Sequence, residues 1–281
     1  MLIHTIAEAR AEVARARHGS KLIGLVPTMG ALHDGHIALV RRARGDCGYV
    51  VVSIFVNPAQ FGPSEDIDSY PRTLESDAAL CNDAGVDLIF APSASEMYPP
   101  GFDAWVEAKG PLTEVLEGAS RPGHFRGVTT VCAKLFNIVQ PDRAYFGLKD
   151  YQQYKAVQRM VRDLGMPLEI VSCETVREPD GLAMSSRNAY LTPEERKAAL
   201  VLVKALRAAQ ETFRAGERNA LALQEMVANL IESEPLASVD YVAIADAESL
   251  RPIDSVEVPA VVLLAVRIGS TRLIDNCLLN P

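Results

Sequence analysis

Several features that mark special classes of protein are missing from this sequence of 281 residues. Its five cysteines lie far apart and form no CxxC pair, so we predict neither a zinc site nor a disulfide framework. No apolar run reaches the ~18 residues that a membrane helix needs. The charged N-terminal stretch is typical of an amphipathic helix and not of an export signal. We therefore expect a cytoplasmic protein with no membrane partner.

Strong positive charge is also missing. The formal net charge is -8, and the sequence has no lysine or arginine run of the kind that binds nucleic acid. We therefore expect no nucleic-acid partner, and an anionic ligand would need a local pocket. With 48% hydrophobic and 23% charged residues, the chain is suited to one large or two modest globular domains.

Apolar, β-branched runs alternate with helical periodicity along the first part of the chain. This alternation predicts an α/β fold, a Rossmann-like doubly wound parallel sheet. The expected strands cover residues 21–26, 49–55, 86–90, 143–146 and 168–176. The expected helices begin near residue 37 and cover residues 73–84, 128–139 and 150–164.

The pattern changes after a turn-rich stretch at residues 177–181, which could act as a hinge. Thr192 and Pro193 are typical of a helix start, and a second helix is expected over residues 220–231. Three strands follow, the last two as a hairpin; they cover residues 239–245, 260–266 and 271–276. We predict a first domain at 1–175 and a smaller C-terminal α+β domain at 176–281.

The most informative motif, HxGH, lies between the first expected strand and its helix. Gly30 and Gly35 allow the backbone to approach a phosphate, and a helix N-terminus offers unpaired N–H groups and partial positive charge. His33 and His36 could then donate to an oxyanion. Two histidines at this spacing could equally form a helix cap or a metal pair.

Two further polar segments follow in the sequence. Lys149 and Asp150 come directly after an expected strand, where open α/β sheets bind ligands, so they could contact phosphate and ribose. The alternative for Asp150 is a solvated helix cap. The segment from Met184 to Asn188 could clamp an anion with two hydroxyls and a guanidinium, although such a segment alone is usually an ordinary polar loop.

HxGH followed by a serine-containing basic loop resembles the nucleotidyltransferase superfamily that includes class I aminoacyl-tRNA synthetases, in whose mobile loop a lysine stands where this chain has Arg187. Six segments in order, over about residues 21 to 191, are similar to the pantoate–β-alanine ligase family: PTMGALHDGH, FVNPAQF, YPRT, RPGHF, FGLKDYQQ and MSSRN. The resemblance implies that ATP and (R)-pantoate form pantoyl adenylate and pyrophosphate. β-Alanine would then give pantothenate and AMP. It also implies Mg²⁺ bound with ATP, and a homodimer.

The resemblance carries residue roles to matching positions. Catalytic roles fall on His36, at the family's proton-donor position, and on His33 and Lys149. Pantoate or β-alanine would contact Gln60, Gln153 and Asn57. ATP would contact Met29, Gly30, Ala31, Leu32, His33, Asp34, Gly35, His36, Gly147, Leu148, Lys149, Asp150, Val176, Met184, Ser185, Ser186 and Arg187.

Other residues have two interpretations each. Asn57 could be a turn residue before Pro58, and Asp77 could contact Mg²⁺ or be a solvated helix carboxylate. Arg121 and His124 could order a loop, contact substrate or form a turn. Rival functions are a simple adenylyltransferase and a nucleotide-binding regulatory module without turnover.

Overall fold

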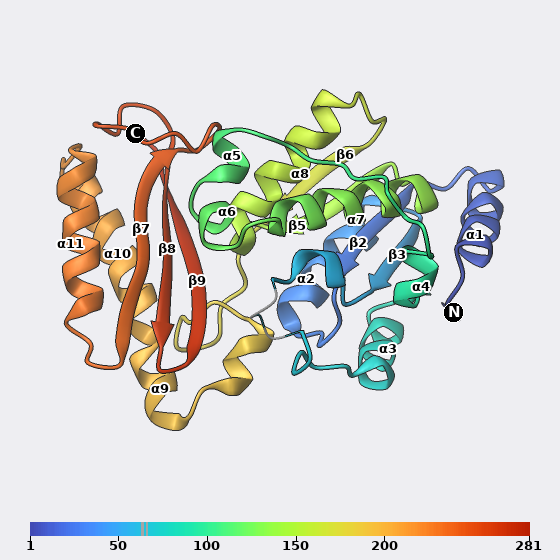
Figure 1. Cartoon of the computed structure of the whole chain (residues 1–281), viewed down its shortest axis with the longest axis horizontal. Helices are drawn as coiled ribbons and strands as arrows, with labels where there is room; N and C mark the ends of the chain where they lie inside the picture. The colour runs from blue at the N-terminus through green and yellow to red at the C-terminus, as the bar shows by residue number, and fades with distance from the viewer. Residues whose placement is uncertain (63–64, 66) are drawn as a thin grey trace. The chain divides into compact units, whose positions relative to one another are not determined.

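The computed structural model describes residues 1–62, 65 and 67–281, and the chain forms two compact units (Figure 1). The first unit comprises Met1–Leu148 and Gln152–Glu174. The second comprises Lys149–Tyr151 and Thr175–Pro281. Among the described residues, none of the helices is both long and apolar enough to cross a bilayer.

The first unit is built on a parallel six-stranded sheet in the order β1-β4-β3-β2-β5-β6. The strands are β1 (Leu2–Ile3), β2 (Ile23–Thr28), β3 (Tyr49–Ile54), β4 (Leu88–Phe90), β5 (Arg143–Gly147) and β6 (Glu169–Cys173). The main helices are α1 (Ile6–His18), α2 (Asp34–Asp46), α3 (Leu74–Asp83), α7 (His124–Val139) and α8 (Tyr151–Asp163). This arrangement confirms the predicted doubly wound α/β class.

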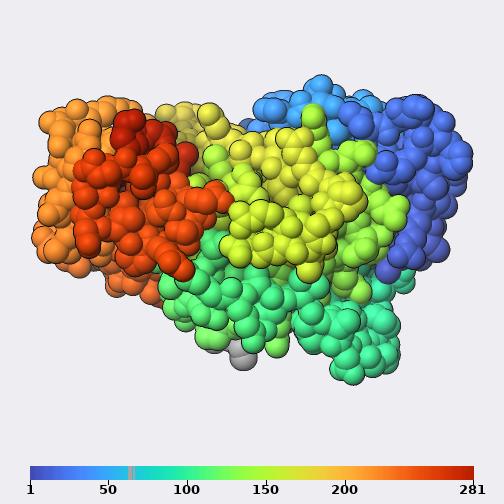
Figure 2. Space-filling view, turned by 90° about the horizontal axis from the view of Figure 1, so that it is seen from above, coloured from blue at the N-terminus to red at the C-terminus, as the bar shows by residue number. Residues whose placement is uncertain are grey.

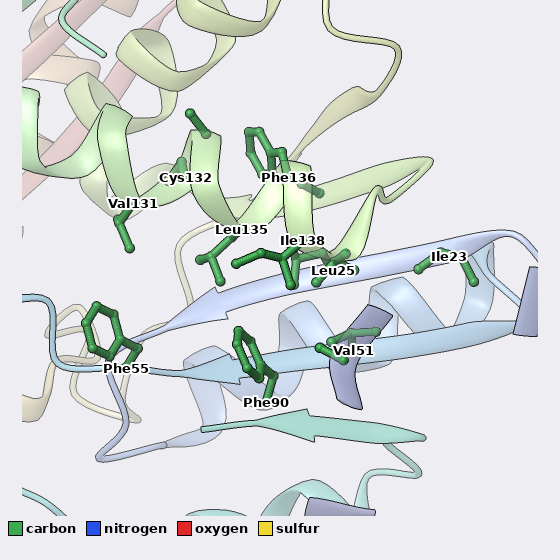
Figure 3. Close-up of a cluster of buried hydrophobic side chains, with 14 of the residues drawn as sticks. Ile23, Leu25, Val51, Phe55, Phe90, Val131, Cys132, Leu135, Phe136 and Ile138 are labelled. Atoms are coloured by element: carbon green, nitrogen blue, oxygen red, sulfur yellow. The ribbon is translucent and has the colours of Figure 1, made fainter. Parts of the chain in front are cut away.

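Both faces of the sheet are covered by helices, because successive side chains of each strand point to opposite sides. In β2, Leu25 packs in the cluster that contains α7 and α8 residues, whereas Val26 packs with residues of α2 and α3. Leu135 and Ile138 of α7 point toward Leu25 in Figure 3. The strands are therefore apolar on both faces, which explains their continuous apolar runs.

The strand order reverses beside β2, which is hydrogen-bonded to β3 on one side and to β5 on the other. The chain moves outward from β2 through β3 to β4, and then returns to the other side for β5 and β6. Open α/β sheets bind ligands at the carboxyl ends of strands at such a switch point. The HxGH segment follows β2, and the segment with Lys149 follows β5.

Short helices and irregular chain connect β4 to α7. They are α4 (Ala94–Met97), α5 (Pro111–Glu114) and α6 (Glu117–Ser120), and a further short helix, η1 (Pro58–Gln60), lies between β3 and α3. In the space-filling view this part of the first unit, in green, forms a continuous area of surface (Figure 2). Trp105 stacks on Tyr98 with ring centroids 6.5 Å apart. Residues 102–109 form no strand, and the Trp105 indole is held by aromatic contacts with Tyr98 and Phe102.

The second unit has an antiparallel sheet in the order β7-β8-β9, which packs against α10 and α11. Its strands are β7 (Ala237–Asp246), β8 (Ala260–Ile268) and β9 (Thr271–Leu279). Its helices are η2 (Leu148–Asp150, of which Leu148 belongs to the first unit), η3 (Ser186–Tyr190), α9 (Pro193–Ala198), α10 (Leu200–Arg214) and α11 (Ala220–Glu232). Thr192 caps α9 in a reciprocal capping box with Glu195, as the sequence predicts.

Candidate active site

The HxGH segment forms a sharp turn between β2 and α2. Gly30 and Ala31 both have left-handed backbone angles, with φ of 86° and 50°. A side chain at Gly30 would meet Asp77 Oδ2 at 3.0 Å and Ile54 at 3.2 Å, so glycine is required there. Ala31 carries a side chain in a region that few non-glycine residues occupy, and surrounding contacts must hold it.

His33 and His36 cap the start of α2. Nδ1 of His33 accepts from the Gly35 N–H at 3.1 Å, and Nδ1 of His36 accepts from the His33 N–H at 3.3 Å. Because each Nδ1 is an acceptor, a neutral ring at either position carries its proton on Nε2. The two rings lie 4.2 Å apart, centroid to centroid. Both histidines therefore present an Nε2–H donor at a helix N-terminus.

Asp77 of α3 holds this turn in place. Its Oδ2 accepts from the Ala31 N–H at 3.0 Å, and its Oδ1 accepts from the Leu32 N–H at 2.8 Å. Thr73 Oγ1 also donates to Oδ2, at 3.2 Å. The side chain is 1% exposed. Asp77 is therefore a buried residue that holds the left-handed turn by hydrogen bonds. Its partners lie far away in the sequence, so residue spacing could not predict this role.

Gln60 and Asn57 form a second buried group in the first unit. Gln60 Nε2 contacts Met29 Sδ at 3.0 Å, and its Oε1 accepts from Asn57 Nδ2, also at 3.0 Å. Asn57 donates to Gly127 O at 3.1 Å and accepts from Tyr98 Oη at 2.8 Å. The structure thus brings Gln60 to the HxGH segment, whereas Asn57 is 1% exposed and supports Gln60 from behind.

Arg121 and His124 lie next to Gln60. His124 Nδ1 is 2.9 Å from Gln60 O, and its Nε2 is 3.2 Å from Arg121 Nη1. The Nδ1–H donates to the carbonyl, so Nε2 accepts from the guanidinium. Arg121 also pairs with Glu65 at 2.6 Å and with Glu117 at 3.8 Å. Burial, and then the charge of Arg121, lower the pKa of His124 to about 4, which keeps the ring neutral near pH 7.

The Lys149–Tyr151 segment belongs to the second unit. Lys149 Nζ is 3.7 Å from Asp150 Oδ1, and its side chain is 19% exposed. Gln153, in the first unit, is half-buried. Its neighbour Gln152 is fully buried and holds the chain at α5 and α6 by donating to Leu112 O and Val115 O. Gln152 is thus a structural residue. The sequence could not distinguish it from Gln153, because both are glutamines in the same segment.

The segment with Met184 to Arg187 is anchored by a short hairpin of the second unit. The Met184 N–H donates to Val176 O at 3.0 Å, and Ser185 Oγ caps η3 by accepting from the Arg187 N–H at 3.3 Å. Asn188 donates to Glu178 at 2.8 Å and to Ala183 O at 3.1 Å. Val176 is therefore a neighbour of residues 184–187, called the MSSR segment below.

No group of three or more acidic, histidine or cysteine side chains suited to a metal ion occurs among residues 1–62, 65 and 67–281. Two buried polar residues of β9, Asp275 and Asn276, were not among the site residues predicted from the sequence. A pair of polar residues inside the otherwise apolar strand 271–279 is the signal that could have drawn attention to it.

A doubly wound sheet with an HxGH turn at its switch point defines a class of nucleotide-binding α/β enzymes. Within this class, residues 1–278 match the family model described as Pantoate-beta-alanine ligase, so the chain belongs to that family. Its activity is the pantoate–β-alanine ligase reaction, which produces pantothenate.

Similar proteins cover the whole chain. A pantothenate synthetase of Roseiflexus castenholzii is 59% identical over 279 residues, 99% of each chain. A crystal structure of pantothenate synthetase from Thermus thermophilus superimposes with a TM-score of 0.95 at 51% identity, covering 100% of this chain and 99% of that one. A pantoate–β-alanine ligase from Francisella tularensis, described as complexed with β-γ ATP and β-alanine, has a TM-score of 0.83 at 35% identity, covering 99% and 97%.

Proposed function

We propose that the chain makes pantothenate in two steps through pantoyl adenylate. A carboxylate oxygen of pantoate attacks the α-phosphorus of ATP, and pyrophosphate leaves. The amine of β-alanine then attacks the carbonyl carbon of the mixed anhydride, AMP leaves, and the amine loses a proton. Activation is needed because an oxide is a far poorer leaving group than AMP. The observation that carries this proposal is the pair of Nε2–H donors at the start of α2.

In the first step the residues would mainly bind and stabilise phosphate charge. His33 and His36 would donate to phosphate oxygens as charge develops, and Lys149 would add a point charge. His36 acts electrostatically in this proposal, because adenylyl transfer gains most from alignment and charge stabilisation. The ATP site would further include Met29, Gly30, Ala31, Leu32, Asp34, Gly35, Gly147, Leu148, Asp150, Val176, Met184, Ser185, Ser186 and Arg187.

Pantoate and β-alanine would be held by Gln60 and Gln153. The contact of Gln60 with Met29 supports this role, since it brings an amide beside the HxGH segment. Asn57 would act through Gln60, because its own amide is occupied by Gln60 and Gly127. The Francisella tularensis complex with β-alanine supports an acyl-acceptor site in the same family.

Mg²⁺ would enter with ATP, bound to its phosphates. The predicted direct contact from Asp77 is not supported by its surroundings, because both carboxylate oxygens already accept hydrogen bonds and the side chain is buried. We therefore assign Asp77 to the turn.

Residues 1–175 would bind the nucleotide and pantoate, and residues 176–281 would act as a lid. The left-handed glycine at position 181, with φ of 99°, supports a bend before the MSSR segment. A reactive anhydride needs shelter from water. The homodimer and the cytoplasmic location stay predictions.

Exchange of labelled pyrophosphate into ATP tests the two-step route. Pantoate alone should support exchange, because the first step is complete and reversible before β-alanine reacts. Replacing His36 with alanine should suppress exchange roughly 30- to 1,000-fold, with a smaller effect on the reaction of supplied pantoyl adenylate with β-alanine. His18→Ala is the matched control, because His18 is an exposed helix residue whose Nδ1 contacts Ala14 O in its own turn.

Absence of exchange in the unmodified enzyme would reject the adenylate route, and equal loss of both half-reactions in His36→Ala would assign His36 to holding the site together. AMP release that needs both pantoate and β-alanine would exclude the simple adenylyltransferase and the regulatory module.

A further inference from the structure

Strand β9 carries two adjacent buried polar residues. Asp275 is 2% exposed and Asn276 is 7% exposed. Because side chains alternate along a strand, the two side chains point to opposite faces of the sheet. Asp275 pairs with Leu264 of β8, and Asn276 pairs with Leu263. A buried polar side chain is expected to have a specific partner, and each of these does.

Asn276 holds the Lys149 segment of its own unit. Its Nδ2 donates to the backbone carbonyl of Lys149 at 2.9 Å. The same segment is held a second time where Tyr151 Oη donates to Ala247 O at 2.8 Å. These contacts explain why Lys149–Tyr151 clusters with the second unit although both neighbouring segments belong to the first. The backbone that carries the Lys149 side chain is therefore fixed by β9.

Asp275 holds the hairpin that leads to the MSSR segment. Its two carboxylate oxygens accept from Arg177 Nη1 at 2.7 Å and Nη2 at 3.0 Å, a bidentate pair. Arg177 Nη1 also donates to Gly181 O at 3.2 Å, and Arg177 forms a β-bridge with Ala183. The residue after this bridge is Met184, the first of the MSSR segment.

We infer that Asp275 and Asn276 are positioning residues of the ligase, which set the spacing between its two ATP-contacting segments in the second unit. Neighbouring Cα atoms in a chain are held about 3.8 Å apart, and the β8–β9 ladder fixes the strand that carries them. One strand thereby serves as a rigid spacer between Lys149 and the MSSR segment. The inference rests on the proposed function, in which both segments contact ATP.

Asn276→Ala tests the contact with Lys149. Loss of the anchoring hydrogen bond should raise the Kd for ATP, measured by titration calorimetry on the full chain, about 5- to 10-fold. Gln210→Ala is the matched control, since Gln210 Nε2 also donates to a backbone carbonyl of the second unit, Leu278 O at 3.3 Å. The control should bind ATP as the unmodified enzyme does.

A double-mutant cycle separates positioning from general destabilisation. In a Lys149→Ala background, Asn276→Ala should change the Kd for ATP by less than about 2-fold, because the side chain through which it acts has been removed. An equal loss in both backgrounds, or no loss in the unmodified background, would overturn the inference. If Lys149→Ala itself leaves ATP binding unchanged, the proposed role of Lys149 fails instead.

Hydrogen exchange tests both residues at once. Asn276→Ala should speed exchange at residues 149–151 and not at 182–190, whereas Asp275→Asn should do the reverse. If Asp275→Asn does not fold, the pair Arg177→Met with Asp275→Leu removes the ion pair without leaving a buried charge and should give the same result. Exchange that rises equally in both segments for either variant would contradict the assignment of one segment to each residue.

Discussion

The carboxylate of Asp77 accepts two backbone N–H groups from the turn that precedes α2. In Asp77→Asn, one oxygen becomes an NH₂ group that cannot accept, so one of these hydrogen bonds is lost. We expect kcat/KM for ATP to fall about 10- to 100-fold, or roughly 1.4 to 2.8 kcal/mol, with an unchanged Mg²⁺ requirement. Initial rates over a grid of ATP and Mg²⁺ concentrations would measure both.

Glu75→Gln is the control for this variant, because Glu75 is an exposed carboxylate on the same helix. A clear rise in the Mg²⁺ concentration needed for half-maximal rate in Asp77→Asn would show that the carboxylate binds the ion and would restore the prediction made from the sequence.

His124 should make stability depend on pH. Burial, followed by the charge of Arg121, lowers its pKa to about 4 in the folded chain, against about 6.5 when unfolded. The unfolded state binds more protons between these values, so this contribution is present above pH 6.5 and is lost as pH falls toward 4. Although burial alone would raise it, the pKa of Glu65 is lowered by Arg121, so that carboxylate stays charged over most of this window.

Urea unfolding at pH 7 and pH 5 measures the effect. From pH 7 to pH 5 the free energy of unfolding should decrease in the unmodified protein. In His124→Asn this decrease should be smaller by about 2 kcal/mol. His18→Asn, which removes an exposed histidine, is the control for the loss of a histidine as such. Identical pH dependence in all three proteins would contradict a buried neutral His124.

At the scale of elements, helix α7 approaches η1 more closely than any side chain permits. A Cβ at Gly127 would lie 2.2 Å from Ala59 O and 2.6 Å from Gln60 Cα. Gly127→Ala should therefore push the two elements apart and lower the free energy of unfolding by about 2 to 4 kcal/mol. Because Gln60 would move too, the KM for pantoate should rise. Thermal unfolding and steady-state kinetics would measure these changes.

Gly45→Ala supplies a control of opposite sign. Gly45 lies in α2, and a Cβ there would meet nothing within 4 Å. Alanine should stabilise the helix by about 0.5 to 1 kcal/mol. Equal behaviour of the two variants would mean that helix propensity, and not the close approach at Gly127, decides the result.

Most long elements were predictable because their apolar periodicity directly reflects burial on the sheet. Their ends were less predictable. Helix α7 starts at His124 and not at 128, because Gly123 adopts a left-handed angle, φ 84°, that ends the preceding turn. Strand β6 ends at Cys173 and not at 176, because its partner strand β5 ends at Gly147, which pairs with Cys173. The short helices α4, α5 and α6 have too few residues for any periodicity to develop.

For the whole molecule, binding of ATP and pantoate should order the MSSR segment. Hydrogen exchange at residues 182–190 should slow when both ligands are added, because a reactive anhydride has to be kept from water. Exchange in α11 should be unaffected, since the helix is packed in the core of the second unit. Unchanged exchange at residues 182–190 would count against a lid.

The candidate site was predictable where one segment carries its own chemistry and was not where the contact is made across the chain. The HxGH segment could be recognised as a turn and a helix start within ten consecutive residues, because these are local structures. The partners of Asp77 lie 45 and 46 residues away, and those of Asp275 and Asn276 lie 98 and 127 residues away. Only the fold brings such pairs together.

The turn between β8 and β9 consists of Gly269 and Ser270. The ladder begins with the pair Ile268 and Thr271 and continues without a register shift to Ala260 and Leu279. Inserting or deleting one codon here would exchange the faces of Asp275 and Asn276 while also moving Leu273 out of the core. Such a frame-preserving change alters no residue that contacts a substrate, yet it should be as harmful as losing one. In evolution this turn is therefore expected to keep its length.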